Sequence, residues 1–152
     1  MTIYDWHYEE DLRGESWRFF KEKGFDVVAC PALFCYPHMG LPARRNFENI
    51  RMLSHIARQN DLAGLNTTIW VPSRYLSDII WQGIAYAAEL SWGSSHFNEE
   101  SFCLHFMWNF YGSKEGRAFY KAWKDLTSIA WHRNEFNLPS RDKVTMNRSK
   151  TE

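Results

Sequence analysis

The residues best suited to catalysis or ligand binding lie together near the start of the chain: Asp5, Trp6, His7 and Tyr8. A carboxylate beside an imidazole can hold or move a proton, and the two rings can stack on a flat ligand. Alternate residues of a strand share a face, so Asp5 and His7 are expected to point one way and Trp6 and Tyr8 the other. The alternative is an ordinary strand end that leads into a solvated loop.

Two further stretches carry residues that could bind a ligand. Trp70 closes a strand-like run, where its ring could fill a core or form a stacking wall for a sugar. Tyr36 and His38 lie in a long loop with Pro37, Gly40 and Pro42, and long loops that follow strands are often functional. The predicted substrate-binding residues are Asp5, Trp6, His7, Tyr8, Tyr36 and Trp70.

The sequence contains no self-contained catalytic set. Glycosidic cleavage needs two acids held across one bond, but residues 9–11 lie in a loop and Glu99 with Glu100 is explained as helix-start charge. Cys30, Cys35 and His38 lack a fourth zinc ligand at normal spacing. Nucleophile, phosphate-loop and His-Glu metal motifs are also absent from the sequence. We therefore predict no catalytic residue, no metal and no cofactor.

The composition of the chain restricts its partners. At 152 residues it can form one domain with a substantial core, and 18 basic residues balance 18 acidic ones, which argues against a nucleic-acid partner. The three cysteines and the polar N-terminus indicate neither a disulfide framework nor a signal peptide. The most apolar stretch, residues 79–90, is too short to span a membrane. These features predict a cytoplasmic protein with no membrane partner.

Three strand-like runs, each followed by a helical stretch, predict the fold. The strands are expected at residues 2–8, 25–31 and 65–71, and the helices near 15–23, from Asn46 onward and near 76–90. Such alternation predicts parallel strands with chemistry at their carboxyl ends. Because three strands cannot close a barrel, we interpret residues 1–92 as the last three βα units of a partial (β/α)8 TIM barrel.

The pattern changes after Trp92, and only helices are expected beyond it. Asn98 followed by two acids predicts a helix start, and the aromatic residues Phe102, Phe106 and Phe110 recur at helical spacing. A last helix is expected over 115–133. Residues 93–136 are therefore predicted to form an α-helical C-terminal extension, and residues 137–152 a flexible tail.

The succession of residues 4–9, 23–31 and 65–70 resembles the last third of a family 20 glycoside hydrolase, the β-N-acetylhexosaminidase family, whose catalytic domain is a (β/α)8 barrel. The resemblance implies that Trp6 and Trp70 form an aromatic wall of the sugar pocket and that Tyr36 bonds the acetamide. The family's catalytic Asp-Glu pair has no counterpart here. Pro72 stands where the family often has an acid that contacts sugar hydroxyls.

Two function hypotheses follow. In the first, the chain is a C-terminal fragment of such a hydrolase that contributes half of an N-acetylhexosamine pocket, is inactive alone, and associates with the missing barrel half or with itself through exposed edge strands. In the second, it is a small non-catalytic α/β module that binds sugars or assembles with a partner protein. The assembly version predicts an interface made of aromatic residues: Phe102, Phe106, Phe110, Phe119 and Trp123.

Overall fold

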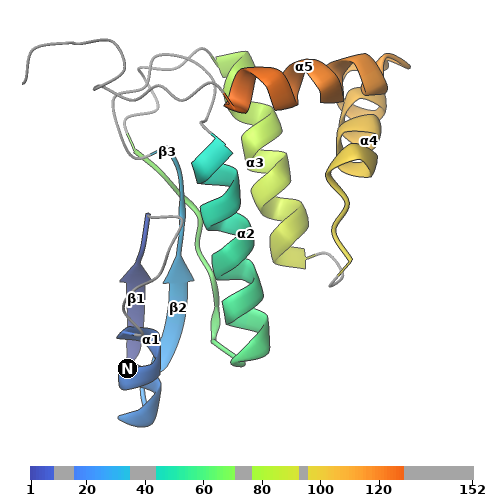
Figure 1. Ribbon diagram of the computed structural model, residues 1–152. Helices are drawn as coiled ribbons and strands as arrows, with labels where there is room; N and C mark the ends of the chain where they lie inside the picture. The colour runs from blue at the N-terminus through green and yellow to red at the C-terminus, as the bar shows by residue number, and fades with distance from the viewer. Residues whose placement is uncertain (9–15, 35–43, 71–76, 93–95, 129–152) are drawn as a thin grey trace, which may run out of the picture.

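The computed structural model describes residues 1–8, 16–34, 44–70, 77–92 and 96–128 (Figure 1). Five helices accompany five short strands in the described residues. The strands are β1 (Thr2–Trp6), β2 (Asp26–Cys30), β3 (Ala32–Phe34), β4 (Gly64–Leu65) and β5 (Thr68–Ile69). The helices are α1 (Ser16–Glu22), α2 (Arg44–Gln59), α3 (Ser77–Trp92), α4 (Glu99–Tyr111) and α5 (Gly116–Ser128). None of these helices is long and apolar enough to cross a membrane.

The strands pair in parallel in two small sheets. One sheet has the order β1-β2-β4 and the other pairs β3 with β5. Tyr4 lies opposite Val28, and Val28 opposite Gly64. β1 lies at the edge of its sheet, where a further strand could pair with it. Association through this edge stays a prediction.

The predicted partial TIM barrel is wrong. The described strands form sheets of three and two strands and no barrel. A barrel needs strands long enough to tilt and stagger around an axis, whereas β4 and β5 have two residues each. Pro31 separates β2 from β3 because proline has no backbone N–H for the ladder. The third predicted crossover helix, α3, instead packs against α2 and α4 (Figure 1).

The main core lies among the helices rather than against the first sheet. It draws on β3 and on α2 to α5, and its buried residues are Leu33, Phe47, Ile50, Tyr86, Ala87, Leu90, Cys103 and Trp123. A smaller cluster joins β2 to α2 through Ala29, Leu53 and Ala57. Most of the stability gained from apolar burial is therefore expected where α2, α3, α4 and α5 meet.

Two glycines allow close contacts between elements. A Cβ atom at Gly83 of α3 would lie 2.5 Å from Cδ2 of Leu33, and one at Gly116 would lie 2.7 Å from the Cα atom of Leu104 in α4. Real Cβ atoms essentially never come this close to other heavy atoms. At position 116 a larger residue would press on the backbone of α4, so glycine allows α5 to approach α4 this closely; at position 83 a larger residue would displace the Leu33 side chain.

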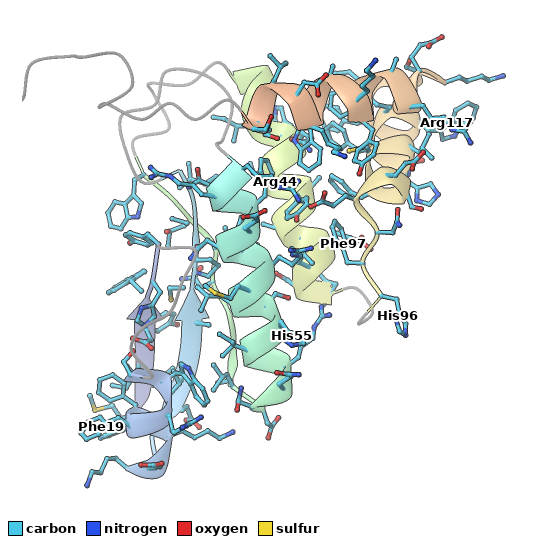
Figure 2. All side chains as sticks on the ribbon, viewed as in Figure 1. Phe19, Arg44, His55, His96, Phe97 and Arg117 are labelled. Carbon is cyan, nitrogen blue, oxygen red and sulfur yellow. The ribbon has the colours of Figure 1, made fainter. Side chains whose placement is uncertain are left out.

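A partly buried ion pair joins the first turn of α2 to the first turn of α4. Nη1 of Arg44 donates to Oε2 of Glu99 over 2.9 Å, and the Tyr86 hydroxyl donates to Oε1 of the same carboxylate over 3.2 Å. Burial alone would lower the pKa of Arg44, but the hydrogen bonds and charges of Glu99 and Glu48 together outweigh it and raise that pKa. The Arg44 guanidinium also lies 5.7 Å from the ring centroid of Trp123 in α5. The Glu99 carboxylate thus links α2, α3 and α4, and Arg44, labelled at the start of α2 in Figure 2, reaches α5.

Replacing Glu99→Gln should lower the free energy of unfolding by about 1–3 kcal/mol, because Arg44 then loses its buried charged acceptor. Urea denaturation measures the change. The matched control is Glu100→Gln, whose side chain is 48% exposed and 3.7 Å from Arg117, whereas the Glu99 side chain is 13% exposed. The control should cost less than about 0.5 kcal/mol. Equal losses in the two variants would mean that the helix-start charge, and not the ion pair, is responsible.

Candidate functional site

A compact polar cluster lies beside the end of β1. Nε2 of His7 is 3.1 Å from Oδ2 of Asp5 and 2.7 Å from Oγ of Ser16, and the Ser16 hydroxyl donates to the same carboxylate oxygen over 2.7 Å. The alternation rule placed Asp5 and His7 on one face, and their contact agrees with it. Sequence reasoning missed Ser16, the first residue of α1, because no spacing rule pairs it with a strand eleven residues earlier.

The geometry of this cluster is not that of a nucleophile relay. A relay needs a histidine that accepts the serine proton at one nitrogen and is oriented by a carboxylate at the other. Here Ser16 gives its proton to Asp5, so its oxygen must accept from Nε2–H of His7. Serine and carboxylate contact the same imidazole nitrogen. The cluster therefore fastens α1 to β1 and does not activate Ser16.

Buried amides of α2 hold the ends of the strands together. Nδ2 of Asn49 donates to the carbonyl of His7 over 3.0 Å, while its Oδ1 accepts from the amide of Ala32 over 3.2 Å. Nδ2 of Asn46 donates to the carbonyl of Ala32 over 3.4 Å. Both asparagines are buried. Asparagines among the apolar residues of a predicted helix indicate buried hydrogen bonds, because buried polar groups need partners. The search for motifs in the sequence did not use this signal.

The structure brings together two of the predicted site residues, Tyr8 and Trp70. Nε1 of Trp70 donates to the Tyr8 hydroxyl over 2.9 Å, and the two ring centroids are 6.5 Å apart at 69°. Tyr8 follows β1 and Trp70 follows β5, so the contact joins strand ends that belong to the two different sheets. The indole of Trp70 remains 47% exposed. The hydrogen bond to the Tyr8 hydroxyl thus fixes the orientation of the partly exposed Trp70 ring.

The other predicted residues lie apart from this pair or outside the described residues. Trp6 is 54% exposed and alternates with Asp5 along β1, so it shares the open face of the sheet with Tyr4. Asp5 and His7 are engaged with Ser16 on the covered side. Tyr36 lies outside the described residues, as do His38, Pro72 and the loop acids at positions 9–11.

Neither of the described cysteines, Cys30 and Cys103, is a reactive thiol. Burial and the charge of Asp5 raise the pKa of Cys30 to about 11, and burial and the charge of Glu99 raise that of Cys103 to about 12. A thiol must ionise to act as nucleophile or metal ligand. Among the residues with described positions, no three His, Cys, Asp or Glu side chains are placed to hold a metal ion. Cys35, the third cysteine, lies outside them.

The aromatic residues of the predicted assembly interface do not form one surface. Phe106 and Trp123 are 6% and 2% exposed and belong to the interior, whereas Phe110 is 50% exposed. Phe106, Phe110 and Phe102 nevertheless line a groove of about 510 Å³ between α3 and α4. Sequence reasoning recognised the Phe repeat but not the groove, whose other wall comes from residues about twenty positions earlier.

Replacing Ser16→Ala should lower the free energy of unfolding by about 1–2 kcal/mol, since it removes two hydrogen bonds in a partly buried cluster. Urea denaturation measures the loss. Ser128→Ala is the control, because that exposed hydroxyl only donates to the Asp125 carbonyl within its own helix. If both variants lose the same stability, the cluster does not fasten α1 to the sheet.

The free energy of unfolding should fall as the pH rises above 9. The ordinary thiol pKa is 9.0, and the folded values of Cys30 and Cys103 are about 11 and about 12. Between these values the unfolded chain has released protons that the folded chain retains, so alkali favours unfolding by about 1.4 kcal/mol per thiol at pH 10. Urea titrations at pH 8 and pH 10 measure the difference. In Cys103→Ala it should shrink by about that amount; an unchanged difference would contradict the assignment.

Comparison with known proteins supplies no relative. No protein-family model, no curated protein and no solved structure matches this chain. The resemblance to family 20 glycoside hydrolases therefore stays a prediction, and the function of the strand ends has to be argued from their own geometry.

Proposed function

We propose that this chain binds a carbohydrate without hydrolysing it, through the aromatic pair formed by Tyr8 and Trp70. The observation that carries the proposal is the half-exposed indole of Trp70, whose N–H donates to the Tyr8 hydroxyl over 2.9 Å. Trp70 thus has the sugar-stacking role expected from the sequence, but without a TIM barrel around it.

A pyranose ring offers two kinds of surface to a protein, a flat face and a polar edge. Its C–H groups form a flat apolar face that packs on an indole, while its hydroxyl groups need polar partners around the edge. The Tyr8 ring lies nearly perpendicular to that of Trp70 and brings a hydroxyl to the edge of the indole. Because this contact already orders both side chains, less conformational entropy is lost on binding.

The polar groups nearby support binding rather than cleavage. Of the acids that the structure describes, Asp5 is the nearest in sequence to Tyr8; its side chain is only 12% exposed and is engaged by His7 and Ser16. Hydrolysis by two acids needs a pair held on opposite sides of the bond. N-acetylhexosaminides are the first sugars to test, because the acetamide adds a methyl group and an amide to the ring contacts.

Trp70→Ala should weaken binding of N-acetylglucosamine about tenfold, because the stacking face is lost. Calorimetric titration at millimolar sugar measures the affinity, with glucose as the comparison ligand. Trp92→Ala is the matched control, since that ring is 91% exposed at the end of α3. Tyr8→Phe keeps the ring but removes the acceptor for the indole N–H, and should weaken binding about threefold.

Three results would contradict the proposal: no measurable binding of either sugar, binding that survives Trp70→Ala, or an equal loss in Trp92→Ala. Circular dichroism of each variant shows whether the fold is retained. An intermediate affinity in Tyr8→Phe would show that the hydroxyl orients the indole.

A further inference from the structure

The groove between α3 and α4 has the size of a ligand site. Its volume of about 510 Å³ lies within the range of about 300–1,000 Å³ common for small-molecule pockets. Figure 2 shows Phe97 between α3 and the segment that leads into α4. Ala85 and Glu89 form the α3 wall, and the remaining lining residues belong to α4 or precede it.

Stacked rings form the apolar side of this groove. Phe102 and Phe106 have centroids 6.0 Å apart at 21°, and Phe106 and Phe110 lie 5.1 Å apart at 17°. Phe110 is half exposed, and its ring lies 6.1 Å from that of Trp81 on α3. The negative face of an aromatic ring attracts a cation, and the attraction strengthens where water is partly excluded.

The permanently charged side chains of the two helices are all acidic, and two histidines, His96 and His105, also line the groove. Residues 77–111 contain Asp78, Glu89, Glu99 and Glu100 and no lysine or arginine. Glu99 is neutralised by Arg44, and Glu100 lies 3.7 Å from Arg117. Glu89 is the only acid that lines the groove, and no described cation forms an ion pair with it.

We propose that the groove between α3 and α4 binds an organic cation with an apolar body, which places its ammonium group between the phenylalanine rings and the Glu89 carboxylate. Asn98, Ser101 and Asn109 offer neutral polar groups to the rest of the ligand. A neutral ligand of the same shape would gain only apolar contact, whereas a cation gains the attraction of the rings and of Glu89. This site is separate from the Tyr8–Trp70 pair, so each proposal can fail alone.

The test compares choline with 3,3-dimethylbutan-1-ol, a neutral molecule of nearly the same shape. We expect choline to bind with a dissociation constant on the order of 1 mM and about tenfold more tightly than the alcohol. Amide chemical shifts measured by NMR during the titration should move at Ala85, Ser101, His105 and Asn109. Equal affinity for the two ligands, or no choline-dependent shifts in these amides, would overturn the proposal.

Matched variants separate the charge from the rings. Glu89→Gln should weaken choline about threefold and leave the alcohol unchanged, while Glu115→Gln, at an exposed position outside the groove, should change neither. Phe110→Leu should also weaken choline about threefold, whereas Phe19→Leu, at an exposed position of α1, should not. Unchanged choline affinity in both groove variants would show that the cation binds elsewhere and would overturn the proposal.

Discussion

The partly buried pair of Arg44 and Glu99 is the constraint on which the helical half of this protein depends. A carboxylate that is largely withdrawn from water must be matched by a cation and by hydrogen bonds, and here Arg44 and Tyr86 supply them. The three residues come from α2, α3 and α4, so the correct relative position of these helices is required before the charge is satisfied. The buried rings of Phe47, Tyr86 and Trp123 then pack against one another beside this ion pair.

Helix α2 organises both halves of the molecule. Its first turn carries Arg44, which contacts the other helices, and Asn46, which bonds the first residue of β3. Its next turn carries Asn49, which bonds the residue that follows β1. Since the carbonyl of His7 is held by Asn49, the residue that follows it, Tyr8, is placed beside Trp70. The polar residues of one helix thus determine the position of the aromatic pair at the strand ends.

Local signals predicted local features well, and pairings between distant residues could not be predicted. Asn98 caps α4 by accepting from the Ser101 amide, as the sequence indicated, and Gly112 ends that helix in the left-handed conformation. By contrast, Arg44 and Glu99 are separated by 55 positions, and Tyr8 and Trp70 by 62. Strand-helix alternation also could not show that the strands would be too short for a barrel, because closure depends on tilt and stagger rather than on order.

The glycine at position 83 makes the packing of α3 on β3 depend on a missing side chain. A Cβ atom there would lie 2.5 Å from Cδ2 of Leu33, a fully buried residue of the main core. A larger residue at position 83 would therefore have to displace the Leu33 side chain from its contacts in that core. The absence of one methyl group thus connects the spacing of α3 and β3 to the packing among the helices.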